Sequence, residues 1–126
     1  MYRLLIVEDE EIIRRGLKSN VPWTKMGFQV VGEAENGKIA LDIIPTLNPD
    51  VVLTDIRMPV VDGIELMSIL NDRNPDIKVV ILSGYSEFEY ARKGIEYGAY
   101  YYLLKPTRKS SIKDRRNTLR RGFKRQ

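Results

Sequence analysis

The sequence of 126 residues contains no cysteine and no histidine. Without cysteine there is neither a disulfide framework nor a thiolate metal site, which is compatible with a reducing compartment. Without histidine, the serine–histidine and cysteine–histidine nucleophile pairs, the usual zinc ligands and the commonest general base are excluded. Carboxylates, lysines, tyrosines and hydroxyl groups are the side chains left to carry chemistry.

Long apolar runs are also missing. No run approaches the ~20 residues that cross a membrane. Met1 leads directly into a strand-like segment rather than a signal peptide. We therefore expect a soluble, cytoplasmic protein that has no membrane partner. A chain of this length is expected to form one domain whose core needs no cross-links.

Charge is divided unevenly along the chain. Residues 1–106 carry 12 Lys and Arg against 16 Asp and Glu, whereas residues 107–126 carry 9 against 1. The net charge of +4 therefore comes from the C-terminal end. For this reason the overall charge does not indicate that the whole domain binds nucleic acid.

The C-terminal segment, residues 108–126, has only a weak helical pattern. Ile112, Leu119 and Phe123 follow one helical stripe, but basic residues interrupt it. We predict a basic segment that is either a partial fifth helix or a frayed tail. Its charge could bind DNA phosphates in a salt-dependent way, and the bland alternative is that the chain is a fragment whose output domain is absent.

The most informative stretch is Val51-Val52-Leu53-Thr54-Asp55, an apolar run that ends on a carboxylate. A run without alternation predicts a strand that is buried on both faces. Asp55 would lie at the carboxyl end of that strand, and in open α/β sheets ligands bind in the crevice at those ends. The alternative from this stretch alone is an aspartate that caps a turn.

Short apolar runs and segments of helical spacing alternate along the rest of the chain. Strands are predicted over residues 3–7, 28–32, 51–55, 77–82 and 101–104. Helices are predicted from the acids at 8–11 to the break at 20–23, from 35–37 to 48–50, from 62–63 to 74–76, over 87–97, and after 106. In the first helix the helical spacing involves Ile12, Ile13 and Leu17. This alternation implies a parallel sheet with right-handed crossovers and helices on both faces.

Polar side chains follow four of the predicted strands: Glu8 and Asp9, Asp55, Ser83, and Lys105. If these strands are parallel neighbours, the side chains converge on one crevice. Three carboxylates repel one another unless a cation holds them, and an all-oxygen site indicates Mg²⁺. A lysine and a hydroxyl group opposite them suit a phosphoryl group, which an aspartate can accept.

Each residue alone has an ordinary explanation. Glu8 and Asp9 could be capping acids, Ser83 could belong to a turn, and Lys105 could be a surface lysine. Their joint occurrence at successive strand ends is much harder to explain in that way.

Four motifs resemble the receiver domains of two-component response regulators: Ile6–Glu10, Leu53–Pro59 with Asp62-Gly63, Leu82–Gly84 and Tyr102–Pro106. The resemblance covers residues 1 to about 107, which we predict to be the receiver domain. It implies a flavodoxin-like (CheY-like) α/β fold. In that fold a doubly wound, five-stranded parallel sheet has strand order 2-1-3-4-5 and helices on both faces.

By resemblance, Asp55 is the phosphoacceptor. Glu8, Asp9 and Asp55, with the backbone carbonyl of Arg57, would hold Mg²⁺ or Mn²⁺, directly or through water. Glu8 departs from the family pattern, in which an aspartate is commoner. The glutamate keeps the charge but lengthens the arm, which affects the geometry of the metal site.

The resemblance also assigns the residues that respond to phosphorylation. Ser83 and Lys105 would contact the phosphoryl oxygens, and Tyr102 would be the aromatic switch residue that moves with Ser83. A sensor histidine kinase is the implied partner. The chain would be a signalling domain that catalyses only its own phosphorylation and dephosphorylation, not an enzyme.

Residues 22–28 and 32–37 look like the receiver subfamily that precedes AraC-type DNA-binding domains. This implies transcription regulation, with DNA bound only through an output domain absent from the chain. The family also implies a homodimer through the face made by the helix over 87–97, the strand over 101–104 and the helix that follows. The basic tail departs from the acidic, leucine-rich fifth helix that the family has at that face.

Two other functions compete with this interpretation. A dehalogenase-type phosphatase needs a second aspartate two positions after the nucleophile, where this chain has Arg57. A flavodoxin needs a hydroxyl- and glycine-rich loop after the first strand, where the acids at 8–11 would instead repel the FMN phosphate.

Overall fold

The computed structural model describes residues 1–56, 58–83 and 101–104, with the backbone alone for residues 83 and 101–104. Two predicted site residues, Arg57 and Lys105, lie outside the described residues. The helices expected over residues 87–97 and after residue 106 lie outside them as well, as does the basic segment 108–126.

Five parallel strands form a single sheet in the order β2-β1-β3-β4-β5. This confirms the predicted topology and the number of strands. The observed bounds differ from the predicted ones by at most two residues at an end. The strands are β1 (Tyr2–Val7), β2 (Phe28–Ala34), β3 (Val51–Asp55), β4 (Lys78–Ser83) and β5 (Tyr101–Leu104).

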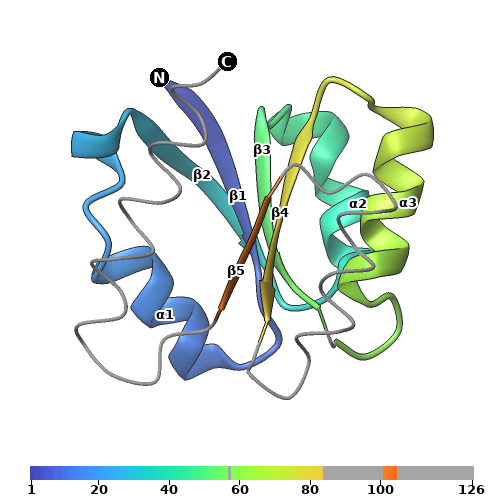
Figure 1. Cartoon of the computed structure of the whole chain (residues 1–126), viewed down its shortest axis with the longest axis horizontal. Coiled ribbons are helices and arrows are strands. Elements are labelled where there is room, and N and C mark those ends of the chain that lie inside the picture. Colours follow the sequence, from blue (N-terminus) through green and yellow to red (C-terminus); the bar gives the residue numbers. More distant parts are fainter. Residues whose placement is uncertain (57, 84–100, 105–126) are drawn as a thin grey trace.

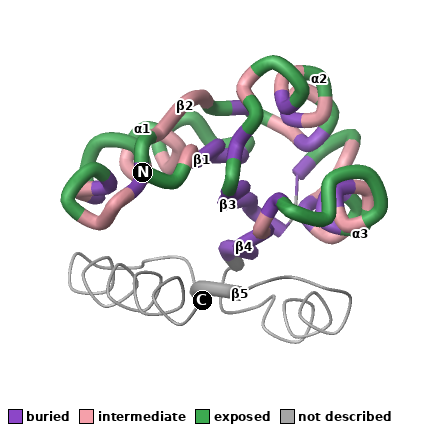
Figure 2. Tube along the Cα trace, turned by 90° about the horizontal axis from the view of Figure 1, so that it is seen from above, coloured by how far each residue is buried: buried purple, intermediate pink, exposed green. Residues whose placement is uncertain are grey.

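The described helices cover both faces of this sheet. They are α1 (Glu11–Ser19), α2 (Gly37–Leu47) and α3 (Gly63–Arg73), with a short 3₁₀ turn, η1 (Thr24–Met26), before β2. Seen from above, α1 lies on one side of the strands, and α2 and α3 lie on the other (Figures 1 and 2). Helices on both faces were predicted, and this is confirmed.

Local chemistry explains where α2 and α3 begin and end. The side chain of Asn36 accepts a hydrogen bond from the Ile39 amide at 2.8 Å, and that of Asp62 accepts one from the Glu65 amide at 2.8 Å. These caps satisfy amides that have no partner within the helix. Helix α2 ends at Asn48, whose φ of 50° is left-handed and which precedes a proline.

The core consists of two apolar layers separated by the sheet. All five residues of β3 are buried, as predicted for a strand enclosed on both faces. The two layers meet the sheet through alternate residues of each strand. The layer on the side of α2 and α3 includes Leu5, Val7, Ala34, Val52 and Ile81; the layer on the side of α1 includes Leu4, Ile6, Phe28, Val51 and Leu53.

Helix α1 is less apolar on its inner face than its sequence suggests. Leu17 packs against the core, but Ile12 is 86% exposed. The helix predicted from the spacing of Ile12, Ile13 and Leu17 is confirmed, but the first of these residues faces solvent. Successive helical residues are rotated by about 100°, so Ile12 and Ile13 cannot both face the sheet while Leu17 does.

The pairing of β1 with β2 contains a bulge. Leu4 is opposite Val30 and Leu5 is opposite Gly32, so Val31 is an extra residue in β2. Phe28 and Val30 pack on the α1 side of the sheet, whereas Ala34 packs on the α2 side. Without the extra residue, positions 28, 30 and 34 would share one face. The bulge therefore exchanges the faces of β2 halfway along the strand.

Arg3 lies near the start of β1, at the edge where the strands begin, and links this edge of the sheet to the C-terminal end of α2. Its Nη2 and Nε donate to the Leu47 carbonyl at 2.7 and 3.2 Å, and its Nε also reaches the Asn48 carbonyl at 3.3 Å. Its amide donates to Asp50 Oδ2 at 2.8 Å. The guanidinium thus satisfies carbonyls that a helix end leaves without partners.

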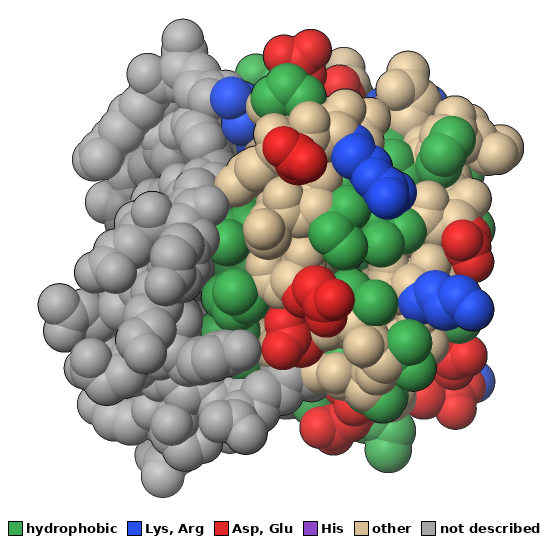
Figure 3. Space-filling view, turned by 90° about the vertical axis from the view of Figure 1, so that its right-hand side faces the viewer, with side chains coloured by type: hydrophobic (Ala, Val, Ile, Leu, Met, Phe, Trp, Pro, Cys, Tyr) green, Lys and Arg blue, Asp and Glu red, His purple; other side chains and the backbone are tan. Residues whose placement is uncertain are grey.

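The surface on the α2 and α3 side is mixed in character. Acidic, basic and apolar side chains alternate on this face without one dominant patch (Figure 3). Among the described residues, no helix combines the length and apolarity that a membrane crossing requires.

Candidate functional site

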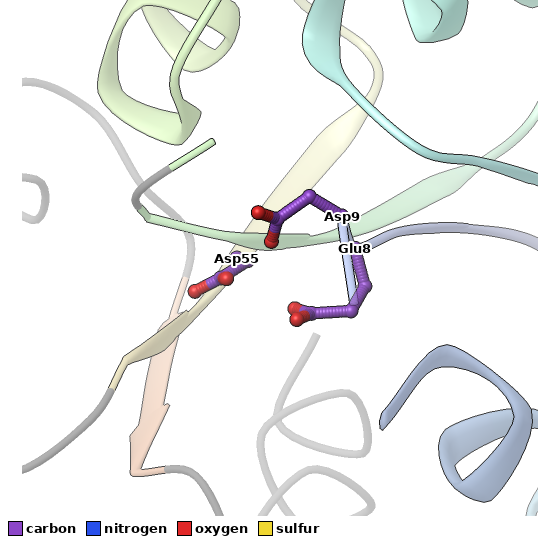
Figure 4. Close-up of side chains that lie close together, drawn as sticks. All are labelled: Glu8, Asp9 and Asp55. Atoms are coloured by element: carbon purple, nitrogen blue, oxygen red, sulfur yellow. The ribbon is translucent and has the colours of Figure 1, made fainter. Parts of the chain in front are cut away.

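Three carboxylates meet where β1 and β3 end. Glu8 and Asp9 directly follow β1, and Asp55 is the last residue of its neighbour β3. One carboxylate oxygen from each residue lies within 4.8 Å of those of the other two. The three side chains point toward the same space (Figure 4). The predicted convergence of these acids therefore holds.

The burial of the three acids differs. Glu8 is 0% exposed and Asp55 is 2% exposed, whereas Asp9 is exposed. Burying a carboxylate is costly unless positive charge or hydrogen bonds compensate for the lost hydration. One oxygen of Asp55, Oδ1, accepts a hydrogen bond from the Ile56 amide at 2.8 Å. Asp55 thus has a local backbone contact, but its burial beside two other acids is unlike a solvent-facing turn cap.

The loop between β3 and α3 is held tightly against Asp55. The Gly63 amide donates to the Ile56 carbonyl at 2.8 Å. A Cβ on Gly63 would overlap the Asp55 carbonyl oxygen and come within 2.9 Å of the Ile56 Cα. Only glycine allows this approach without a shift of the backbone.

The middle of this loop is strained and also touches α2. Val60 is 72% exposed and has a φ of 72°, a left-handed value that is rare for a β-branched residue. The next residue, Val61, accepts the amide hydrogen of Gly37 at 3.2 Å through its carbonyl. A Cβ on Gly37 would lie 2.6 Å from that oxygen. Helix α2 therefore begins directly against the loop that follows Asp55.

A shallow hollow of about 400 Å³ opens beside the acids. Its described lining residues are Asp9, Met58, Pro59 and Asp62. Of the three acids, Asp9 alone is among these described lining residues, so the hollow gives access to the exposed side of the cluster.

Arg14, a residue of α1, contacts the backbone of Glu8, one of the three acids. Arg14 Nη1 donates to the Glu8 carbonyl at 2.8 Å, and Arg14 Nε donates to Glu33 Oε1 at 3.1 Å. Lys18 Nζ lies 3.2 Å from Glu33 Oε2. Arg14 lowers the pKa of the Glu33 carboxyl below its ordinary value; partial burial acts in the opposite direction, and Lys18 lowers the pKa further.

The sequence interpretation did not single out Arg14. A signal was nevertheless present, because Arg14 lies three residues before Leu17 and four before Lys18, on one side of the helix. A basic residue beside an apolar one on the inner face of a helix indicates a partly buried charge that needs an acidic partner.

The remaining predicted site residues belong to β4, β5 and the undescribed parts of the chain. Ser83 is the last residue of β4, which is the neighbour of β3. The backbone of Tyr102 is paired with that of Ile81 in the adjacent strand β5. This places the Ser83 backbone at the same edge of the sheet as Asp55, while the side-chain roles of Ser83 and Tyr102, and the roles of Arg57 and Lys105, stay predictions.

The donor set fits a hard cation. All three side chains offer carboxylate oxygens, the ligands that Mg²⁺ prefers. Two oxygens on opposite sides of one Mg²⁺ are about 4.2 Å apart, and the cluster spans 4.8 Å. Oxygens at adjacent positions around Mg²⁺ are about 3 Å apart, so a closer approach of the side chains, or a water bridging one of them to the ion, would bring all three acids to one cation.

Curated relatives align with most of this chain. The transcriptional regulatory protein YesN of Bacillus subtilis is 38% identical over 112 residues, which are 89% of this chain and 30% of that protein. The transcriptional regulatory protein HptR of Staphylococcus aureus is 44% identical over 107 residues, which are 84% of this chain and 41% of that protein. The chain thus spans less than half the length of these relatives.

Solved structures resemble the whole fold. The receiver domain of AraT, a response regulator from Geobacillus stearothermophilus, matches with a TM-score of 0.84 and 32% identity, covering 98% of this chain and 96% of that one. A two-component transcriptional regulator AraC from Clostridium phytofermentans matches with a TM-score of 0.84 and 35% identity, covering 98% and 94%.

The family model of the response regulator receiver domain matches residues 4–117. The matched range includes the three acids and the loop that Gly63 closes. This chain therefore belongs to the response regulator receiver domain family of two-component signalling.

Proposed function

We propose that Asp55 accepts a phosphoryl group from a phosphohistidine of a sensor histidine kinase. A carboxylate oxygen of Asp55 attacks phosphorus, a P–O bond forms as the P–N bond breaks, and the imidazole leaves and takes up a proton. The observation that carries this proposal is the position of Asp55, buried at the end of β3 with two further carboxylates within 4.8 Å. Such a site can hold a cation against a phosphoryl group.

Glu8, Asp9 and Asp55 are proposed to hold Mg²⁺ or Mn²⁺, together with the backbone carbonyl of Arg57. When bound, the cation offsets the charge of the carboxylates and of the incoming phosphoryl oxygens. Asp55 supplies the nucleophile, and Glu8, Asp9 and Asp55 supply the carboxylate ligands of the cation. The Ile56 amide, 2.8 Å from Asp55 Oδ1, keeps that carboxylate in a fixed orientation.

The response to phosphorylation is assigned by resemblance. Ser83 and Lys105 contact the phosphoryl oxygens, and Ser83 and Tyr102 change position together as the switch. The backbone supports part of this assignment, because Ser83 ends the strand beside Asp55 and Tyr102 lies in the next strand. The domain acts as a substrate that assists its own phosphorylation and dephosphorylation, not as an enzyme with turnover.

The output is proposed to be transcription regulation. YesN and HptR are transcriptional regulatory proteins longer than this chain. We assign residues 1–107 to the receiver and 108–126 to a basic segment, and DNA is bound only through an output domain outside this chain. A homodimer through the face made by the helix expected over 87–97, the strand over 101–104 and the helix expected after 106 is part of the proposal. The location is cytoplasmic, because the kinase that supplies the phosphoryl group uses ATP.

Phosphorylation by a small donor tests the assignment directly. Incubation with acetyl phosphate and Mg²⁺ is expected to add one phosphoryl group, detected by intact mass, and removal of Mg²⁺ with EDTA is expected to prevent it. Asp55→Asn should abolish the labelling. Asp42→Asn, which changes an exposed aspartate of α2, is the matched control and should be labelled like the wild type. Labelling of Asp55→Asn at the wild-type level would show that another residue accepts the phosphoryl group.

A further inference from the structure

Two neighbouring arginines of α1 behave very differently. Arg15 is 74% exposed and pairs with Glu11 one turn away at 2.7 Å. The side chain of Arg14 is only 14% exposed and reaches two other elements. An arginine on a helix surface commonly keeps its head group in water, so the inward position of Arg14 requires a specific reason.

The backbone of Glu8 is fixed on both sides. Its amide donates to the Ala34 carbonyl of β2 at 3.0 Å, and its carbonyl accepts from Arg14 Nη1 at 2.8 Å. We propose that Arg14 is a positioning residue for the cation site, because it fixes the turn that presents the carboxylates of Glu8 and Asp9. This inference rests on the proposed function of the acidic cluster as a cation site.

Glu33 holds the other side of the Arg14 guanidinium. It accepts from Arg14 Nε at 3.1 Å and pairs with Lys18 at 3.2 Å. Glu33 can do so because the extra residue Val31 turns the second half of β2 over, which places Glu33 opposite Ile6 on the α1 side. The rigid fork of arginine then spans the gap between Glu33 and the Glu8 carbonyl, which a single ammonium group cannot bridge in the same way.

The length of the Glu8 side chain makes this support useful. Glutamate has one more rotatable bond than aspartate, so a small shift of its backbone moves its carboxylate farther. Metal ligands need to be held near their bound geometry, and the groups that orient them affect affinity strongly. Fixing the Glu8 peptide from two directions limits the displacement of its carboxylate that arises from movement of the backbone.

Charge alone predicts the opposite effect. A guanidinium close to the acidic pair repels a cation, so removing its charge should tighten cation binding. A positioning role predicts that removing Arg14 weakens cation binding. The direction of the change therefore separates the two roles.

The test is a Mn²⁺ titration of the unphosphorylated chain followed by electron paramagnetic resonance. Arg14→Gln is expected to weaken Mn²⁺ affinity about tenfold. Arg14→Lys, which keeps the charge and can satisfy one acceptor, should recover part of this loss. Glu33→Gln should weaken affinity less than Arg14→Gln, because Arg14 can still reach the Glu8 carbonyl.

Three controls separate positioning from charge and from stability. Arg15→Gln removes the same charge from α1 and should leave the affinity unchanged or slightly tighter. Lys18→Gln removes the second cation from Glu33 but makes no contact with Glu8, and it should have little effect. Arg3→Ala lowers stability at the opposite edge of the sheet and should leave Mn²⁺ affinity unchanged.

The outcomes are distinct. If Arg14→Gln binds Mn²⁺ as tightly as the wild type or more tightly, or if Arg3→Ala weakens binding as much, the positioning role is wrong while the cation site stands. If the wild type shows no saturable binding, or if Asp55→Asn binds Mn²⁺ unchanged, the cation site itself is wrong and the role of Arg14 is lost with it.

Discussion

The backbone of Gly63 lies directly against the carbonyl of Asp55. A Cβ at position 63 would overlap that oxygen, and the Gly63 amide is bonded to the Ile56 carbonyl at 2.8 Å. The first residue of α3 and the proposed phosphoacceptor are therefore packed as one unit. A side chain at position 63 would have to move the end of β3.

Gly63→Ala is expected to lower the free energy of unfolding by about 2 kcal/mol, as for other overpacked sites. The displaced Asp55 should also bind Mn²⁺ more weakly. Urea denaturation followed by far-ultraviolet circular dichroism measures the first effect, and a Mn²⁺ titration measures the second.

Gly16→Ala is the matched control for this change. The nearest atom to its added Cβ is Asn20 Nδ2 at 3.6 Å, an ordinary contact. Because alanine favours the helix over glycine, this variant should gain up to about 1 kcal/mol. Equal destabilisation by both substitutions would contradict the argument from close packing.

Relief of backbone strain at Val60 should stabilise the protein. Asparagine tolerates the left-handed region much better than a β-branched residue does. Val60→Asn is expected to raise the free energy of unfolding by about 1 kcal/mol, since the 72% exposed side chain contributes little to the core. A thermal midpoint unchanged or lowered relative to the wild type would show that the φ of 72° is not costly here.

Arg3→Ala should destabilise the fold without affecting the acidic cluster. The substitution removes the bonds to the Leu47 and Asn48 carbonyls at the end of α2. Bonds from a charged donor contribute more than neutral ones, and we expect a loss of about 2 kcal/mol in urea denaturation. Acetyl phosphate labelling of folded Arg3→Ala should proceed as in the wild type, and a loss of labelling would imply communication between the two edges of the sheet.

Cation binding should appear as added stability. At a Mg²⁺ concentration ten times the Kd, linkage predicts a gain of about 1.4 kcal/mol for the wild type. Asp9→Asn should abolish most of this gain. The same variant should be more stable than the wild type in EDTA, because one of three mutually repelling carboxylates is gone. If Asp9→Asn and the wild type respond equally to Mg²⁺, Asp9 is not a ligand.

The pairing of Glu33 with Arg14 and Lys18 should depend on pH. The folded-state pKa of Glu33 is lowered, so its contribution is fully present above the ordinary value of 4.5 and is lost as the pH falls through the lowered value. The side chain is 36% exposed, so solvent screening keeps the contribution well below about 1 kcal/mol. Wild type and Glu33→Gln should differ in stability near neutral pH and converge in acid. A difference that grows in acid would contradict this sign.

The part of the site that could be predicted from the sequence consists of the residues that lie at the ends of strands. Buried parallel strands are continuous apolar runs, so the positions where β1 and β3 end are visible in the chain as Val7 before Glu8 and Thr54 before Asp55. Parallel pairing then brings the acids together at one edge. The starts of α2 and α3 near residues 35–37 and 62–63 were predicted for a similar reason, because they depend on local chemistry.

The features that escaped prediction depend on how separate elements meet. The inward turn of Arg14 is decided by Glu33, which lies on another element and 19 residues away. The left-handed φ of Val60 opposes its own residue preference and occurs in a loop whose neighbouring residues are bonded to Gly63 and Gly37. The exposure of Ile12 is set by which side of α1 faces the sheet. Each of these features depends on contacts between elements, although the position of Arg14 beside Leu17 and the turn of about 100° from Ile12 to Ile13 are visible within α1.

The bulge at Val31 accommodates one residue of β2 that has no partner in β1. Deleting Val31 would remove the bulge but keep Leu4 opposite Val30 and Leu5 opposite Gly32, so Glu33 would stay on the side of α1 and Ala34 on the side of α2. A relative that lacks one residue at this position can therefore keep the contact between β2 and α1, whereas a one-residue slip of β2 along β1 would turn Glu33 to the other face of the sheet.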